Sequence, residues 1–312
     1  MKGSVYSILV ELLIFTACGI FLSRKSIISS DASKVLSDFL LKLVLPFSLI
    51  ASSQQRFKGS ALYASLVSLL LGFIYYLLSF LLCFLILPLF IKDRESLPIS
   101  FDLVLFANVG FLGFSVIPLL FGNTATLYTI FHNFVFQLFF FTIGMEKAEG
   151  SEKSVREILS PQKLLTNKII MISAASMILY CLPFRFPTMI TDSISAIGSM
   201  MTPLSLIIVG LQIGSMDPSS LIKEKGVIPL TLIRMLLLPA LFFIVLILLP
   251  FDVAVKRVAF ILYCMPSASL SAVIAEKYNR RPALACSVVA LSTLIFFALL
   301  PLDLVACDRF FS

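Results

Sequence analysis

The chain has 312 residues, of which 59% are hydrophobic and 13% are charged, about half the charged fraction of roughly 25% found in soluble domains. A water-soluble domain of this length could not hide so much apolar surface, so lipid must be the solvent for much of the chain. The net charge of +7 falls largely in short segments between apolar runs, and the six cysteines form no C-x-x-C pair, so we expect no nucleic-acid partner, no metal site and no cofactor.

Apolar runs long enough to cross a bilayer recur along the whole chain. A membrane-spanning helix needs about 20 predominantly apolar residues. Such runs predict ten spans, at 4–22, 33–52, 61–90, 101–121, 124–145, 168–183, 189–213, 227–249, 254–276 and 282–305. The first run is not read as a signal peptide, because Glu11 interrupts its apolar core and only Lys2 precedes it. The predicted fold class is therefore all-α: a polytopic protein of ten transmembrane helices.

The basic residues predict how these spans are oriented. With the N-terminus outside, the inner loops hold fifteen Lys and Arg residues and the outer segments hold seven. Because positive charge is enriched in cytoplasmic loops, this bias favours both termini outside. We therefore expect a multi-pass protein of the cytoplasmic membrane, with the lipid bilayer as its surroundings.

The chain divides into two similar halves. The polar stretch 146–167 is predicted to be a cytoplasmic linker between 1–145 and 168–312, each with five spans. The second span contains Pro46-Phe47-Ser48-Leu49-Ile50, and 157 positions later the seventh contains Pro203-Leu204-Ser205-Leu206-Ile207. Five is an odd number, so the halves insert in opposite orientations, as in the inverted repeats of secondary transporters. Pro46 and Pro203 are predicted helix breaks.

Two spans carry residues that interrupt helices. In the fourth span, Asn108, Gly110 and Gly113 make a poor helix interior, and Gly113 is a further predicted break. In the ninth, Pro266 removes a backbone donor and clashes with the carbonyl four residues earlier. The shift of 157 places Val109 opposite Pro266, so we expect both breaks at the same place in their repeats.

The two interruptions are expected to cross, because unwound backbone at membrane depth costs several kcal/mol for each unsatisfied group. The positive ends of the half-helices that begin near Phe111 and Ser267 would then face a shared cavity and suit an organic anion. The carbonyl ends of the preceding half-helices would instead suit a cation. The predicted substrate-binding residues are Asn108, Val109, Gly110, Pro266, Ser267, Ala268 and Ser269.

Three charged residues inside spans are candidates for coupling or charge compensation. Asp38 and Lys42 are four positions apart, so they share a helix face and can pair. A structural ion pair, or a Lys42 side chain that reaches toward the interface, are the alternatives. Arg234 could bind or steer an anion, or it could hold carbonyls freed by Pro239.

Glu11 and His132 are candidates for proton coupling, because both lie within predicted spans. His132, the only histidine, is followed by Asn133, with Gln137 one helical turn further along. A packed, hydrogen-bonded histidine is the alternative interpretation.

Several motifs resemble one family over essentially the whole chain. They are Met265-Pro266-Ser267-Ala268-Ser269 followed by A-x-x-Y-x-x-x-P from Ala275 to Pro282, Asn108-Val109-Gly110-Phe111-Leu112-Gly113 with Phe121-Gly122, Leu45-Pro46, and Arg234 with Pro239. The chain thereby resembles the auxin efflux carrier family, which includes bacterial malate-permease-like carriers and the plant PIN carriers.

The resemblance implies ten helices in two inverted sets of five, with a scaffold of helices 1, 2, 6 and 7 and a moving transport domain of helices 3–5 and 8–10. It implies that the crossing of helices 4 and 9 holds a carboxylate, with Asn108 at the position of the family's crossover asparagine. Plant carriers have an acidic and a basic residue one turn apart on helix 3, whereas residues 61–86 here are uncharged. A homodimer through the scaffold helices is a further hypothesis.

The leading hypothesis is a non-enzymatic carrier that moves a small carboxylate by alternating access, as a secondary active or facilitated transporter coupled to H+, to Na+ or to neither. One alternative is a sodium-coupled carrier of the bile-acid type, which shares the broken-helix architecture. Others are an intramembrane enzyme, for which the sequence has no H-E-x-x-H or G-x-S-x-G motif, and a channel or membrane sensor.

Overall fold

The computed structural model describes residues 2–55, 58–93, 95–149, 166–182, 184–216 and 223–311, and in these segments it contains helices and no strand. The first half comprises α1 (Lys2–Arg24), α2 (Ser30–Phe39), η1 (Leu40–Val44), α3 (Leu45–Ser53), α4 (Gly59–Phe90), α5 (Leu97–Leu105), η2 (Val109–Gly113), α6 (Phe114–Phe121), α7 (Asn123–Phe139), η3 (Phe140–Gly144) and α8 (Met145–Glu149). The second comprises α11 (Lys168–Cys181), α12 (Thr188–Gly198), α13 (Met201–Gly214), α14 (Val227–Leu232), η4 (Ile233–Leu237), α15 (Leu238–Leu248), α16 (Val253–Cys264), α17 (Ser269–Lys277) and α18 (Pro282–Phe310). The elements labelled η are single wide turns of π-helix.

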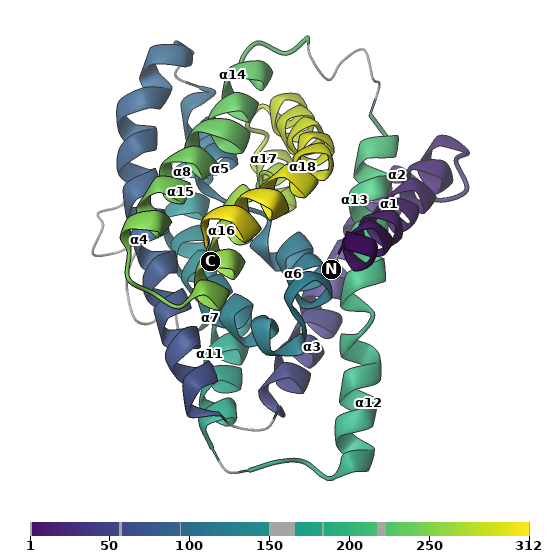
Figure 1. Cartoon of the computed structure of the whole chain (residues 1–312). Helices are drawn as coiled ribbons and strands as arrows, with labels where there is room; N and C mark the ends of the chain where they lie inside the picture. Colours follow the sequence, from purple (N-terminus) through teal and green to yellow (C-terminus); the bar gives the residue numbers. More distant parts are fainter. Residues whose placement is uncertain are drawn as a thin grey trace.

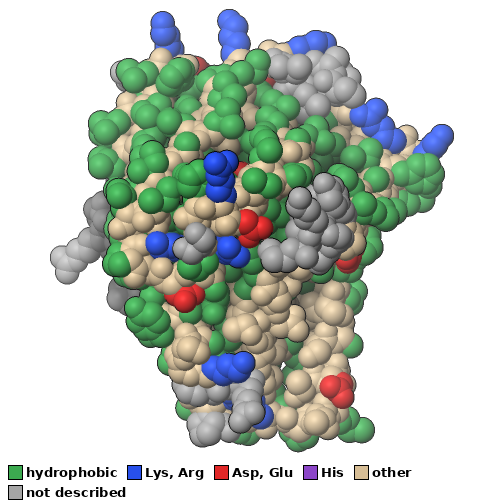
Figure 2. Space-filling model, in the orientation of Figure 1, with side chains coloured by type: hydrophobic (Ala, Val, Ile, Leu, Met, Phe, Trp, Pro, Cys, Tyr) green, Lys and Arg blue, Asp and Glu red, His purple; other side chains and the backbone are tan. Residues whose placement is uncertain are grey.

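The helices coincide with the apolar runs of the sequence. Within the described segments, six helical runs are long and apolar enough to cross a membrane, at Ala32–Ser53, Gly59–Phe90, Asn123–Lys147, Thr188–Gly214, Val227–Leu248 and Pro282–Phe310. On α4 the side chains of Leu77, Phe84 and Leu89 are exposed, and Figure 2 shows hydrophobic side chains over much of the visible face. An all-helical protein with such an exterior is a membrane protein.

The expected linker begins later than the sequence suggested. We expected it at residue 146, but the helical run from Asn123 continues through α8 to Glu149. The charged residues Glu146 and Lys147 do not end the helix, because charged side chains at the membrane boundary are compatible with helical backbone. The remainder of the expected linker, 150–165, lies outside the described residues.

Prolines do not interrupt the second and eighth runs. Pro46 lies in the first turn of α3 and Pro239 in the first turn of α15, and each follows one π-helical turn. A proline excludes the carbonyl four residues earlier, and the wider turn displaces that carbonyl so that the helix continues. Pro203 lies just inside α13, and the chain turns before it, at Ser199 and Met200. Gly113 likewise lies within a continuous run from η2 into α6.

Glycines allow α1 and α13 to pack in direct backbone contact, and Figure 1 shows α1 (purple) lying across α13 at one edge of the molecule. A Cβ added to Gly19 would meet the carbonyl oxygen of Ile207, and one added to Gly210 would meet that of Thr16. Small residues at such contacts are typical of membrane helices, whose association depends on close packing rather than on exclusion of water.

We expect Gly210→Ala to destabilise the protein by about 1–3 kcal/mol, the usual effect of overpacking, because neither backbone at this contact can yield. Thermal unfolding of the purified protein in detergent measures the effect. Gly59→Ala is the matched control, because a Cβ at Gly59 meets nothing within 4 Å. Equal unfolding midpoints for the two variants would contradict the assignment of Gly210 to a tight contact.

Arg281 forms ion pairs that link three loops at one end of the molecule. Arg281 pairs with Asp93 at 2.9 Å and with Glu224 at 2.8 Å, and it thus joins the loop after α4, the loop before α14 and the loop before α18. The hydroxyl of Ser96 and the backbone N–H of Glu95 donate to Asp93 and, with Arg281, hold the pKa of its carboxyl below its usual range. The third, fourth, eighth and tenth runs are therefore linked as one body at this end.

Candidate functional site

Two interrupted helices cross in the interior. The first interruption comprises residues 106–108, between α5 and η2, and the second comprises 265–268, between α16 and α17. The N–H of Asn108 donates to the carbonyl of Pro266 at 2.8 Å, and the N–H of Ala268 donates to the carbonyl of Phe106 at 2.9 Å. The two segments run antiparallel at this point. Some of the main-chain groups freed by each interruption are thus satisfied by the other segment, through two hydrogen bonds.

The register of this crossing differs from the expected one. One bond joins Phe106 to Ala268 and the other joins Asn108 to Pro266. The two bonds are equivalent in the two halves if each residue of the first half corresponds to the residue 160 positions later (266 − 106 and 268 − 108), so that Phe106 corresponds to Pro266 and Asn108 to Ala268. The equivalent of Asn108 is therefore Ala268, and Val109 is not opposite Pro266. The shift of 157 came from the second and seventh spans, and the second half contains three more residues between those spans and the crossing.

The polar side chains of the crossing are largely engaged with one another. Asn108 donates from Nδ2 to Ser269 Oγ at 3.0 Å and accepts at Oδ1 from the Phe111 N–H at 3.4 Å. Ser267 donates from Oγ to the carbonyl of Leu103 at 2.6 Å, so its hydroxyl holds α5 in place. The bond between Asn108 Nδ2 and Ser269 Oγ joins two side chains, so a ligand can replace it without breaking a main-chain contact.

A small cavity of about 30 Å³ adjoins the crossing, and three of the predicted substrate-binding residues line it: Asn108, Gly110 and Ala268. Val109, Pro266, Ser267 and Ser269 belong to the crossing but do not line the cavity. Sequence reasoning did not assign two further lining residues, Asn133 and Gln137 on α7. Their spacing of four within an apolar helix, which places two amides on one face, is the signal that could have identified them.

These two amides are available to a ligand. Within the described part of the chain, neither polar atom of the Asn133 side chain has a hydrogen-bond partner, and Oε1 of Gln137 has none. Both residues are almost fully buried, at 1% and 2% exposed. Because buried polar groups are normally hydrogen-bonded, unpartnered amides beside a cavity indicate a place where a polar ligand is received.

The other wall of the cavity is apolar. It is formed by Leu41 of η1, Leu45 of α3 and Ile169 of α11. A volume of about 30 Å³ admits about one water molecule. A carboxylate can therefore enter only if these helices move away from the crossing and α7.

Arg234 on η4 is fully buried and binds the carbonyl ends of both interrupted helices. It donates to the carbonyls of Met265 at 2.6 Å and 3.0 Å, Tyr263 at 2.9 Å and Val104 at 3.3 Å, and also to the hydroxyl of Tyr75. No acidic side chain in the described segments pairs with it. The guanidinium thus compensates the negative C-terminal ends of α5 and α16.

The contacts of Arg234 bear on both hypotheses drawn from the sequence, that it binds or steers an anion and that it holds carbonyls freed by Pro239. The carbonyls that it holds are those released at the crossing, and not those that Pro239 displaces within its own helix. Because the side chain is fully enclosed by protein, its charge acts on the cavity through space and without contact.

The other ionisable candidates do not line the cavity. Lys42 and Asp38 pair at 2.5 Å, as their spacing suggested, with side chains 73% and 62% exposed on the outer surface of the molecule. Glu11 is exposed on α1. His132 is fully buried, with its ring centre 5.5 Å from that of Tyr263, on the α7 face next to Asn133.

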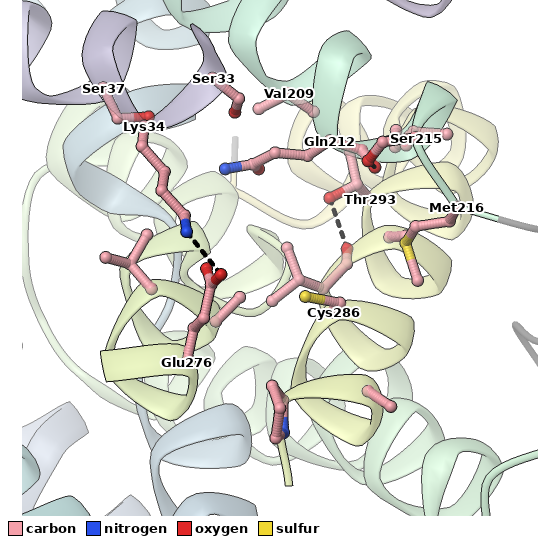
Figure 3. Close-up of a pocket in the computed structure, with 17 residues that line it drawn as sticks. Ser33, Lys34, Ser37, Val209, Gln212, Ser215, Met216, Glu276, Cys286 and Thr293 are labelled. Atoms are coloured by element: carbon pink, nitrogen blue, oxygen red, sulfur yellow. Dashed lines mark hydrogen bonds and ion pairs between the residues drawn. The ribbon is translucent and has the colours of Figure 1, made fainter. Parts of the chain in front are cut away.

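Two larger cavities lie between the α1–α3/α11–α13 group and the remaining helices. One, of about 360 Å³, lies among α2, α13, α17 and α18; Figure 3 shows Lys34 of α2 and Glu276 of α17 meeting there, at 2.6 Å. The second, of about 550 Å³, lies among α3, α6, α7 and α12, toward the opposite end in Figure 1. Between them α6 and α13 touch through Ser115 and Ser205, whose hydroxyls are 2.6 Å apart.

Comparison with known proteins gives one family match. The family model for membrane transport proteins matches residues 4–303, which is nearly the whole chain. No curated protein matches the sequence.

Proposed function

The chain belongs to the auxin efflux carrier family of membrane transport proteins, and from this premise we propose that it moves a small organic anion, a carboxylate, across the cytoplasmic membrane by alternating access. The observation that carries the proposal is the crossing itself, where two interrupted helices exchange main-chain hydrogen bonds beside unpartnered buried amides. Irregular backbone at membrane depth is characteristic of the substrate sites of secondary transporters.

Helix contacts support an arrangement of ten helices in two inverted repeats. α1 packs against α13 while α11 packs against α3, so the first run contacts the seventh as the sixth contacts the second. Likewise α16 contacts α4 and α7, while α5 contacts η4 and α18. If the two halves are exchanged, the contact of the first run with the seventh becomes that of the sixth with the second, and the contacts of the ninth run become those of the fourth. A two-fold axis in the membrane plane produces such matched contacts. We place both termini outside on the charge bias of the loops.

The lining of the cavity favours an anion. Nδ2 of Asn133 is an unpartnered donor, and Nδ2 of Asn108 donates only to another side chain. Gly110 and Leu270 lie at the starts of the two second half-helices, where N–H groups are free. Arg234 adds a positive charge that no acidic side chain of the described segments compensates. A carboxylate would complete this set of donors, whereas a cation would find its carbonyl ligands already bound to Arg234.

Transport requires the two groups of helices to move relative to each other, and the cavities indicate where. In this structure the small cavity has room for about one water molecule, with a larger cavity toward each end of the molecule. We propose that α1–α3 and α11–α13 form a scaffold and that the remaining helices move past it. The contacts Ser115–Ser205 and Lys34–Glu276 would then break and re-form in alternation as one larger cavity or the other joins the site.

The test is a thermal-shift screen of the purified protein with acetate, lactate, succinate and malate, each in sodium and in choline medium. We expect at least one carboxylate to raise the unfolding midpoint, equally in both media. Stabilisation that requires sodium would favour the sodium-coupled bile-acid type of carrier. No shift with any of the four would count against a carboxylate site.

Asn108→Ala is expected to abolish that carboxylate-dependent shift without loss of folded protein, because it removes the donor at the crossing that faces the cavity. Asn133→Leu, which keeps the volume of the side chain but removes its amide, should weaken the shift. Asn279→Gly is the control: it removes an exposed amide at a residue whose φ of +52° suits glycine. A wild-type shift in Asn108→Ala would reject the site.

A further inference from the structure

A buried acid that the proposed site does not use lies on α5. Asp102 is fully buried, and within the described residues neither of its carboxylate oxygens has a hydrogen-bond partner. It precedes Asn108 by six positions, and its own carbonyl accepts the N–H of Phe106, the residue that bonds Ala268 across the crossing. Asp102 is therefore part of the half-helix that leads into the candidate site.

The carboxyl group is packed against the helical run of α7, η3 and α8. A Cβ added to Gly144 would lie 3.5 Å from Oδ1 of Asp102, so this oxygen faces the backbone of η3. Lys147 on α8 is the basic residue that acts electrostatically on Asp102, yet the two form no ion pair. Its ammonium group instead lies 3.6 Å over the ring of Phe101.

Other titratable groups on the neighbouring helices have partners of their own or are neutral. The thiol of Cys83 on α4 is close enough to sense the charge of Asp102. Arg234 on η4 is bound to carbonyls, Glu276 on α17 pairs with Lys34, and Glu146 on α8 has an interaction of its own. Lys147 is thus the group that can exchange partners with Asp102.

We propose that Asp102 is the proton-binding site of this carrier and that Lys147 is its counter-charge, an inference that rests on the proposed transport function. A carboxylate enclosed without a partner is very costly, so the acid holds a proton in this structure. When the proton leaves to the aqueous phase on one side, Lys147 leaves the ring of Phe101 and pairs with the carboxylate. The proton is regained from the other side when the crossing is next accessible there.

Protonation also changes the charge that an incoming anion meets. With Asp102 neutral, the positive charge of Arg234 acts on the cavity without a negative side chain near it. With Asp102 ionised, a negative charge stands six residues from Asn108, three of them in α5 and three in the interruption, which is roughly 10–14 Å along the chain. At an effective dielectric constant of about 20, a charge at that distance alters anion affinity by roughly tenfold. Proton and carboxylate therefore bind together, which is the requirement for symport.

The first test concerns the protonation itself and needs no substrate. Infrared spectra of the purified protein at neutral pH should contain the carbonyl stretch of a protonated carboxyl group that is missing from Asp102→Asn. In Asp102→Glu the band should persist at a shifted frequency, which keeps the test valid if the asparagine variant does not fold. A spectrum unchanged by both substitutions overturns the proposal.

The second test concerns coupling, with labelled malate as the probe in proteoliposomes. An inward-directed proton gradient should stimulate uptake by the wild type, and Asp102→Asn should lose that stimulation while malate counterflow continues. Asp303→Asn is the matched control: Asp303 on α18 is an acid of a spanning helix that is partly exposed and does not line the cavity, so gradient stimulation should persist without it. Stimulation that survives in Asp102→Asn overturns the proposal. Absence of malate counterflow in the wild type would count against the proposed function for malate, and the infrared test would still decide whether Asp102 is protonated.

Discussion

Replacing Arg234 with methionine is expected to lower the free energy of unfolding by about 3–5 kcal/mol, one of the largest effects of any single substitution in this chain. The guanidinium donates to three buried carbonyls, of Val104, Tyr263 and Met265. Each carbonyl left without a partner costs about 1–3 kcal/mol, and no water is available in the interior to replace the lost donor. The unfolding midpoint of the purified protein measures the effect.

Two controls separate this role from a general effect of losing an arginine. Arg185 also donates to carbonyls at the end of a helix, but it is only partly buried, and its two shortest bonds, to Leu182 and Phe184, are exposed, so water can take its place. Arg185→Met should therefore cost less than about 1 kcal/mol. Arg234→Lys keeps the charge but has a single nitrogen for carbonyls of two helices, so its stability should be intermediate. If Arg234→Met unfolded at the wild-type midpoint, Arg234 would not be what holds the crossing together.

The sequence predicted that the chain is all-helical and predicted both interruptions, because these depend on local chemistry. An apolar run of sufficient length must be helical in lipid, and Asn108 with Gly110, or Pro266, prevents regular helix wherever it occurs. Pro46 shows the limit of such reasoning. Proline interrupts the helix at Pro266, but at Pro46 one π-helical turn accommodates it and the helix continues. Only the packing around each proline decides whether the helix is interrupted or continues.

The site itself was less predictable, because it depends on which side chains meet. The register of the crossing differs by three positions from the repeat shift, since the segments between corresponding helices differ in length. Asp102 stands among apolar residues, and nothing in the sequence shows that its carboxyl lacks a partner. Arg234 is a similar case: its depth follows from the sequence, but its three carbonyl partners come from helices 130 and about 30 positions away.

The main-chain bonds of the crossing can be tested directly, because one of them is at a position that accepts proline. Ala268 has φ of −62° and ψ of 127°, which a proline adopts without strain, and Ser267 before it is extended, as a residue before proline should be. In Ala268→Pro the N–H that donates to the Phe106 carbonyl is lost, and the ring occupies the space between the two segments.

We expect Ala268→Pro to remove the carboxylate-dependent thermal shift entirely and to lower stability by about 1–3 kcal/mol, the cost of one buried unsatisfied carbonyl. Ala268→Ser is the matched control, because it changes the side chain but retains the N–H; it should keep a carboxylate-dependent thermal shift. The two substitutions therefore distinguish a requirement for the main-chain bond from a requirement for the small side chain. A full carboxylate response in Ala268→Pro would mean that the helices need not be joined at this bond for the site to form, and the alternating-access mechanism would have to rest on other contacts.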